Sequence, residues 1–400
     1  MRSSARGIAA VGTPHTSSRT NAGVGCTRAT LGHNWQTQPM GAATITTRKR
    51  HAAGPIIALL ALLATWSADL SNVLVAVVVA VLVVAVITAV HHAEVVSARV
   101  GEPYGALILA LAVTIIEVGL IVAIMASSSG TASTLGRDTV FSAIMITCNG
   151  IIGLSVVAAT LKQKLATFNA EGSGAALGAI TVIATLSLVL PTFTRSSSGP
   201  TFTTPQLIFA SIASLGVYIL FLFALTVRYK EHFQNPDVEE LSPHPDRPSS
   251  KDAYTSLGLL VVALIAIVGL AKVVSPAVES GVRQAGLPLF VVAVVVALVV
   301  LLPESFAAVR SARRGDLQTS FNLGYGSAMA SIGLTIPALA IVSSVMDITL
   351  ELGLNATEIV LLVLTVVVGA ITTASPRATL LQGGLHLVIF ASFLVLAISP

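Results

Sequence analysis

Two glutamates stand alone inside long apolar stretches of the chain. Glu117 lies in LAVTIIEVGLIVAIM, which covers residues 111–125, and Glu304 lies in the apolar segment that contains LLPESF. Of the 18 acidic residues, only these two fall well inside the segments that we predict to cross a membrane. An ionised carboxylate in hydrocarbon costs several kcal/mol, so acidic residues there are rare and usually functional. The alternative is a structural pair of permanently protonated carboxyl groups that hydrogen-bond between helices.

Two carboxylates that lie close together can hold either protons or a divalent cation. Burial and mutual repulsion both favour the protonated groups when no cation is present. A divalent cation matches the charge of two carboxylates and displaces their protons, so the site stays close to neutral in both states. The empty, doubly charged site crosses the membrane poorly, which couples proton flow to cation flow. Glu117 and Glu304 are therefore the predicted metal ligands, and we predict no catalytic or cofactor-binding residue.

Other oxygen ligands are needed if the cation is calcium, which prefers about six to eight of them. Two glutamates supply at most four oxygens. Water, backbone carbonyls and nearby polar side chains are expected to supply the others. The candidate side chains are Thr114, Ser142, Thr147, Asn149, Ser305, Asn322 and Ser327.

Small residues recur every three or four positions along 320–335, and together they form one face of a predicted helix. They are Ser320, Gly324, Ser327, Ser331 and Thr335. Such a face can line an ion pathway, or it can let two membrane helices pack closely. The two interpretations are compatible.

The elements that position these residues are membrane-spanning helices. The chain has 400 residues, of which 54% are hydrophobic and 10% charged, and its mean hydropathy is +0.89. This composition excludes an ordinary soluble protein. Apolar runs recur that are long enough to cross about 30 Å of hydrocarbon as helices. Valine-rich runs such as 73–90 are also predicted to be helical, because backbone groups in lipid must be paired within the segment. The predicted fold class is an all-α polytopic membrane protein.

We predict about eleven transmembrane helices, with a long connection that divides the chain. The spans lie near 55–71, 73–93, 103–126, 138–161, 175–193, 205–227, 254–275, 286–309, 318–344, 356–374 and 378–399. The predicted organisation is a polar disordered N-terminal tail (1–50), a first transmembrane helix (51–72), a five-helix repeat (73–227), an acidic cytoplasmic linker (228–253) and a second five-helix repeat (254–400).

The distribution of Lys and Arg indicates the orientation. If the N-terminus is cytoplasmic, the connections on that side carry eleven Lys and Arg residues and the outer connections carry four. Cytoplasmic loops are enriched in positive charge. We therefore expect the N-terminus in the cytoplasm and the C-terminus outside.

The two halves of the chain share a sequence pattern. TVFSAIMITCNGIIGLS at 139–155 matches TSFNLGYGSAMASIGLT at 319–335 with five identical residues, and each segment follows a span with one buried glutamate. Because five is an odd number, two five-span units sit in opposite orientations. Secondary transporters with such inverted repeats bind their substrate near the midplane, where the repeats meet.

With these residues in view, the sequence resembles the bacterial calcium/proton antiporters (ChaA type) of the cation/calcium exchanger superfamily. The resemblance is carried by GEPYGALILALAVTIIEVGLI, GRDTVFSAIMI, LLPESFAAV and NLGYGSAMASIGLTIP, and it extends over about 55–399. It implies one extra helix plus two inverted five-helix repeats, each with an acidic residue that binds calcium and exchanges protons. Those roles fall on Glu117 and Glu304, and the family's Gly-Ser pair falls on Gly326 and Ser327.

The sequence departs from that superfamily at one point. Many of its exchangers carry Gly-Asn-Ala before each glutamate, whereas this chain has VTII and VLLP. The asparagine ligands are therefore missing, and the ion preference stays open.

The predicted function is secondary active cation/proton antiport in the cell (inner) membrane, with calcium exported in exchange for protons. The alternative is a sodium or potassium/proton antiporter, and a non-transport membrane protein would leave the buried glutamates unexplained. An intramembrane enzyme is not favoured, because the sequence has no HExxH or GxGD motif and no P-loop for ATP. The expected partners are calcium, protons and the lipid bilayer, without cofactor or nucleic acid. A homo-oligomer is compatible with the sequence.

Overall fold

The computed structural model describes residues 41–67, 71–101, 104–126, 133–161, 164–233 and 248–400. Residues 1–40 of the predicted tail and 234–247 of the predicted linker lie outside these ranges. Residues Ile45–Pro400 form one compact unit, which contains the membrane-spanning helices and the two glutamates.

The described part of the chain is almost entirely helical, as predicted. Ten helical segments in it are long and apolar enough to cross a membrane, and an eleventh apolar helix, Ala52–Thr65, is shorter. The α-helices are α1 (Gly41–Thr65), α2 (Asn72–Val100), α3 (Tyr104–Met125), α4 (Leu135–Met145), α5 (Ile152–Thr160), α6 (Ala170–Ala184), α7 (Leu190–Phe193), α8 (Thr204–Phe223), α9 (Ser250–Gln284), α10 (Phe290–Arg313), α11 (Leu317–Met346), α12 (Ala356–Thr373) and α13 (Leu380–Ile398).

Short elements of other kinds join or interrupt these helices. Three π-helical turns, η1 (Ile146–Ile151), η2 (Thr185–Val189) and η3 (Ala224–Arg228), continue α4, α6 and α8, and η4 (Lys230–Phe233) is a 3₁₀ turn. Two short strands, β1 (Ala166–Thr167) and β2 (Arg377–Ala378), pair antiparallel. The π-helical turns were not predicted, because hydropathy does not distinguish them from α-helix.

Three helices extend well beyond their predicted spans. α1 begins at Gly41, inside the segment that was expected to be disordered. α2 continues past the predicted end at 93 to Val100, and α9 continues past the predicted end at 275 to Gln284. All three extensions contain charged residues, and hydropathy marks only the apolar part of a helix.

Large apolar side chains lie on the outside of the helices as well as in the core. Leu63, Phe306 and Val345 are 69%, 73% and 80% exposed. This pattern fits helices that face lipid, and the protein is a multi-pass membrane protein.

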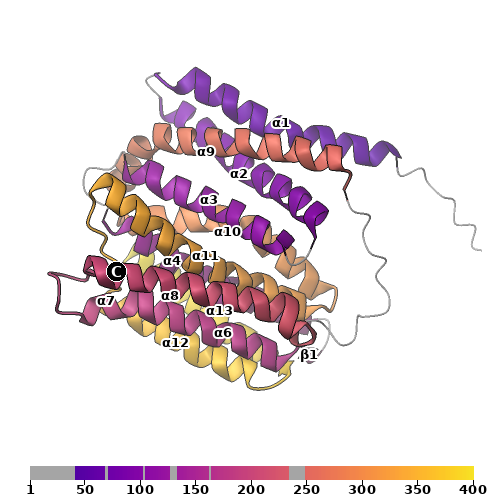
Figure 1. Cartoon of the computed structure of the whole chain (residues 1–400), viewed down its shortest axis with the longest axis vertical. Helices are drawn as coiled ribbons and strands as arrows, with labels where there is room; N and C mark the ends of the chain where they lie inside the picture. The colour runs from indigo at the N-terminus through magenta and orange to yellow at the C-terminus, as the bar shows by residue number, and fades with distance from the viewer. Residues whose placement is uncertain (1–40, 68–70, 102–103, 127–132, 162–163, 234–247) are drawn as a thin grey trace, which may run out of the picture. The chain divides into compact units, whose positions relative to one another are not determined.

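The core consists of two large apolar clusters. One joins α2, α3 and α9 through residues such as Ala85, Ile116 and Ile267, which are fully buried. The other joins α4, α8, α11 and α13 through residues such as Phe141 and Phe321. In Figure 1, α2 and α9 lie on one side, α6, α8, α12 and α13 lie on the other, and α3, α10 and α11 lie between them. The two glutamate helices are thus in the middle.

Corresponding helices of the two predicted repeats make corresponding contacts. In the predicted repeats, α2 corresponds to α9, α3 to α10, α4–α5 to α11, and α8 to α13. α3 packs on α9 and α11, and correspondingly α10 packs on α2 and α4. α8 packs on α11, and correspondingly α13 packs on α5. The matched glycines of the sequence repeat lie at the last two contacts. A Cβ atom on Gly333 would lie 2.6 Å from Tyr218 Cβ, and one on Gly153 would lie 3.0 Å from His386 Cβ. These contacts support the inverted repeat.

Candidate functional site

Glu117 is buried on α3 and is hydrogen-bonded to α11. Its side chain is 4% exposed. Ser331 Oγ donates to Glu117 Oε1 at 2.7 Å, and Thr335 Oγ1 donates to Oε2 at 3.2 Å. The four-residue spacing of Ser331 and Thr335 places both hydroxyl groups on the face of α11 that meets α3.

Glu304 lies on α10 and has fewer partners. Its Oε2 atom is buried and has no hydrogen-bond partner among the described residues. The hydroxyl group of the next residue, Ser305, donates to Leu301 O at 2.7 Å and so is not used by the carboxylate. A buried, unpartnered carboxylate oxygen is costly, and its place in a structure needs an explanation.

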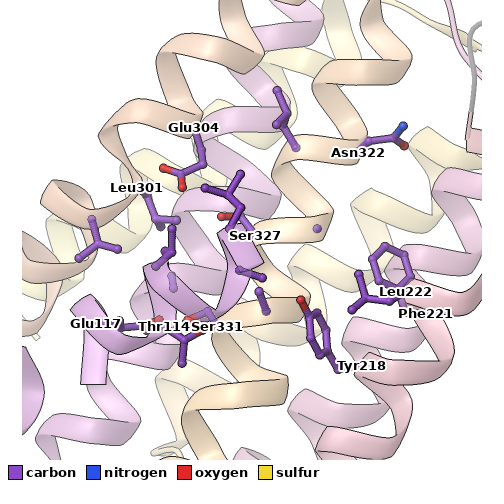
Figure 2. A pocket seen from close by; sticks show the side chains of 18 of the residues that line it. Thr114, Glu117, Tyr218, Phe221, Leu222, Leu301, Glu304, Asn322, Ser327 and Ser331 are labelled. Atoms are coloured by element: carbon purple, nitrogen blue, oxygen red, sulfur yellow. Dashed lines mark hydrogen bonds between the residues drawn. The ribbon is translucent and has the colours of Figure 1, made fainter. Parts of the chain in front are cut away.

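One cavity of about 170 Å³ borders both glutamates. Residues of α3, α4, α8, η3, α10 and α11 line it, and the wall is mostly apolar. Figure 2 shows Glu304 close to Ser327 and Glu117 close to Thr114 and Ser331, with Tyr218 on the wall that α8 supplies. The polar lining residues are Thr114, Glu117, Tyr218, Glu304, Asn322, Ser327 and Ser331.

Four of the eight predicted pathway residues line this cavity: Thr114, Asn322, Gly326 and Ser327. The hydroxyl group of Thr114 is buried and has no hydrogen-bond partner in the described part of the chain. The Asn322 amide is already engaged, since its Nδ2 donates to Phe233 O at 2.6 Å and its Oδ1 accepts from Gln318 Nε2 at 2.8 Å.

The other four, Ser142, Thr147, Asn149 and Ser305, are not among the residues that line the cavity. Ser142 Oγ donates to Asp138 O at 2.6 Å, and Thr147 Oγ1 donates to Ala143 O at 2.7 Å. Hydroxyl groups within helices often bond in this way to the carbonyl one turn earlier. Asn149 Nδ2 instead donates to Thr365 Oγ1 at 2.9 Å.

Three polar residues reach the glutamates or their cavity without having been predicted as site residues. Ser331 and Thr335 belong to the small-residue face at 320–335, and that face was the available signal for both. Tyr218 lines the cavity from α8. No pattern in the sequence distinguishes it from a packing tyrosine.

The helices that carry the glutamates are continuous. α3 stays α-helical from Tyr104 to Met125, and α10 does so from Phe290 to Arg313, with Pro303 inside it. Most backbone carbonyls near the glutamates are therefore occupied by helical hydrogen bonds. Ligands for a cation must come largely from side chains and water. Among the described residues, no group of three or more His, Cys, Asp or Glu side chains is placed to hold a metal ion.

Comparison with known proteins gives a family model and several relatives. The family model described as "Sodium/calcium exchanger protein" matches residues 70–227 and 255–399. The chain is 43% identical over 312 residues to the y4hA protein of Sinorhizobium fredii, which is named as an ionic transporter, and the match covers 78% of this chain and 85% of that protein. It is 31% identical over 347 residues to the Escherichia coli "Sodium-potassium/proton antiporter ChaA", with 85% and 94% covered.

A solved structure shares the fold. The crystal structure of the H⁺/Ca²⁺ exchanger CAX matches with a TM-score of 0.65 and 15% sequence identity, over 88% of this chain and 89% of that one. At this identity the likeness concerns the arrangement of helices.

Proposed function

The chain belongs to the sodium/calcium exchanger protein family, and from that premise we propose that it exchanges a cation for protons at Glu117 and Glu304. One observation carries the proposal. Both carboxylates border the same cavity, and none of the described residues that line it is Lys, Arg or His. The negative charge of the site must therefore be balanced by bound protons or by a bound cation.

The exchange follows from the energy of the charged site. Two ionised carboxylates in a mostly apolar cavity repel each other and are poorly solvated. Protons or a cation remove this penalty, so both loaded states can change their exposure from one side of the membrane to the other. The empty site changes sides slowly. Proton entry and cation export are thereby coupled, and we place the protein in the cell (inner) membrane with its N-terminus in the cytoplasm.

Calcium is the cation that we propose first. One divalent ion neutralises two carboxylates, and the hydroxyl groups of Thr114, Ser327 and Ser331 on the same cavity offer further oxygen atoms. Water would supply the remaining ligands, since calcium prefers about six to eight.

Sodium or potassium is the second candidate, and a specific observation favours it. Because α3 and α10 stay helical at both glutamates, the site has fewer free backbone carbonyls than a calcium site commonly uses. The E. coli relative is also named for sodium and potassium.

Everted membrane vesicles with an acidic interior and a pH-quenched dye test the proposal. Calcium, sodium or potassium chloride is added, and the recovery of fluorescence reports proton exit. We expect calcium-dependent recovery with the wild-type protein and none with the Glu117→Gln/Glu304→Gln double variant. Recovery with only sodium or potassium would select the second candidate. No recovery with any cation, given verified membrane insertion, would contradict antiport.

A further inference from the structure

The glutamate cavity extends toward one end of the helix bundle. Its wall runs from Ser331 to Asn322 near the start of α11, and from Tyr218 on α8 to Leu225 in η3. Leu225 and Asn322 are partly exposed. Phe233 O, in the described part of the predicted linker, accepts from Asn322 Nδ2 at this end, which is the predicted cytoplasmic side. The cavity lies beside α8 and α11, and in an inverted repeat the corresponding elements, α13 and η1–α5, have the opposite orientation in the membrane. A matching space is therefore expected between α13 and η1–α5, toward the opposite end of the bundle.

Helix packing identifies the residues of that matching space. The contact between Gly333 and Tyr218 corresponds to the contact between Gly153 and His386. Because Tyr218 corresponds to His386, residues at equal distances along the chain from these two also correspond. Leu222 therefore corresponds to Phe390, and Leu225 to Phe393. A second contact agrees: a Cβ atom on Gly150 would meet the Phe390 ring at 3.4 Å, and its counterpart Ala330 lines the cavity together with Leu222.

The corresponding positions are bulkier at the opposite end. In the sequence repeat, Gly326 and Ser331 correspond to Ile146 and Ile151, which are the first and last residues of η1. The two isoleucines are 3% and 1% exposed, and they share an apolar cluster with Leu301 and Phe390. Side chains therefore fill the space that is a cavity at the other end.

Aromatic rings extend this packed layer. The Phe393 ring lies 5.9 Å from Phe141, 6.0 Å from Phe290 and 6.3 Å from Phe390, measured between ring centroids. Phe141, Phe290 and Phe393 also line a separate pocket of about 440 Å³, together with Asp138 at the start of α4 and Glu358 at the start of α12. The layer thus separates the glutamate cavity from a pocket at the opposite end of the bundle, which the Arg137–Asp138 ion pair and Glu358 also line.

We propose that Ile146, Ile151, Phe390 and Phe393 form the gate that closes the glutamate site toward the end opposite to its cavity. This rests on the exchange function proposed above, in which the site must never be open to both sides. An apolar layer offers no ligand to a cation and no chain of hydrogen bonds to a proton. Both gate isoleucines belong to a π-helical turn, and such turns are frequent at functional sites of helices. Opening would separate the rings of α13 from η1.

Side-specific cysteine labelling tests the gate. The background carries Cys26→Ser and Cys148→Ser, and Ala330→Cys places a reporter on the cavity wall. A membrane-impermeant trimethylammonium methanethiosulfonate is applied to right-side-out and to everted vesicles. We expect labelling mainly from the side toward which the cavity extends.

Two double variants then swap leucine and phenylalanine between the corresponding positions of the two ends. Phe390→Leu with Phe393→Leu replaces the gate rings by the leucines found on the cavity wall, and labelling from the opposite side should rise by about tenfold. Leu222→Phe with Leu225→Phe installs the rings on the cavity side, and labelling from that side should fall by a similar factor. The second exchange keeps the proposal testable if the first variant does not fold.

The matched control is Phe209→Leu, because Phe209 is 64% exposed on α8 and does not line the cavity. It should leave the ratio of the two labelling rates unchanged. Two results would contradict the gate. In the first, the two folded double variants keep the ratio of labelling rates of the parent protein. In the second, Phe209→Leu changes that ratio as much as they do. The labelling readout also separates the gate from the proposed ion site. Suppose that the Ala330→Cys protein that also carries Glu117→Gln and Glu304→Gln keeps full exchange activity and shows the expected labelling. That result would contradict the proposed ion site but not the gate.

Discussion

Glu117 and Glu304 take corresponding places in α3 and α10, yet their carboxylates have different surroundings. Ser331 and Thr335 donate to the two oxygens of Glu117. In the sequence repeat these residues correspond to Ile151 and Ser155. Ile151 has no hydroxyl group, and Ser155 Oγ and Glu304 Oε2 are both buried without hydrogen-bond partners among the described residues.

Among the described residues, the repeat thus supplies two carboxylates but one set of hydrogen-bond donors, the pair Ser331 and Thr335. Hydrogen bonds to a charged acceptor are short and strong, so Ser331 and Thr335 hold Glu117 in one orientation. Glu304 keeps an acceptor atom free. We therefore expect Glu117 to fix the place of the cation, and Glu304 to turn toward the cation or proton that enters.

The largest expected effect comes from removing either carboxylate. Glu117→Gln or Glu304→Gln should each lower cation/proton exchange by about 100-fold or more, because an amide neither carries the negative charge nor takes up the proton. Dye recovery in everted vesicles measures this. Glu358→Gln is the control, since Glu358 accepts from Asn355 N at the start of α12 at 2.8 Å and a glutamine can cap the helix in the same way. Full exchange by either single variant would show that the carboxylates do not act as a pair.

A smaller effect is expected from Ser331→Ala. The variant removes the 2.7 Å hydrogen bond to Glu117, and bonds to charged groups contribute about 1.5–3 kcal/mol. The apparent affinity for the cation should fall by about tenfold or more. Concentration dependence of dye recovery measures the affinity. Ser320→Ala is the control on the same helix face, because Ser320 Oγ has no hydrogen-bond partner among the described residues. Equal losses in both variants would indicate a packing effect.

Thr335→Val should have a weaker effect than Ser331→Ala. The hydrogen bond that it removes is 3.2 Å long, and valine keeps nearly the same shape. We expect the apparent cation affinity to fall by about threefold, which corresponds to a net contribution below 1 kcal/mol. The same titration measures it. A loss larger than that of Ser331→Ala would reverse the assigned order of the two donors.

The smallest effect on cation affinity is expected from Ile151→Ser, which reduces the difference between the glutamates. Cation binding to the purified protein measures it, because Ile151 also belongs to the proposed gate and transport would report both roles. Ile151 shares an apolar cluster with Leu301 and Ala308, about one turn on either side of Glu304. A hydroxyl group there should raise the apparent cation affinity by about twofold to threefold, while the smaller side chain lowers thermal stability. Ile144→Ser is the control, because Ile144 is fully buried in a different cluster, the large one that joins α4, α8, α11 and α13. If both variants change affinity alike, Ile151 has no specific influence on Glu304.

The fold was largely predictable from hydropathy. Long apolar runs identified the helices, and the odd number of spans per unit suggested opposite orientations before any contact was known. The extension of α9 to Gln284 and the π-helical turn at Ile146–Ile151 were not predictable. Hydropathy averages over a window and reports neither polar helix ends nor a local change in hydrogen bonding.

The site was predictable only in its charged residues. Glu117 and Glu304 stood out because a carboxylate in hydrocarbon is rare. The hydroxyl groups did not, because a sequence repeat does not tell which face of each helix meets the glutamates. Thr147 was therefore a predicted ligand and Ser331 was not, although Thr147 bonds to its own helix and Ser331 donates to Glu117.

Proton release on cation binding tests most directly whether the pair holds either protons or a cation. Purified protein in weakly buffered detergent, with a pH indicator, is titrated with calcium, sodium or potassium. The account predicts about two protons released per bound calcium ion at a pH where both glutamates are protonated, and markedly fewer for Glu117→Gln or Glu304→Gln, with Glu358→Gln like the wild type. Calcium or monovalent cation binding without proton release in the wild type, or unchanged release in both glutamine variants, would contradict it.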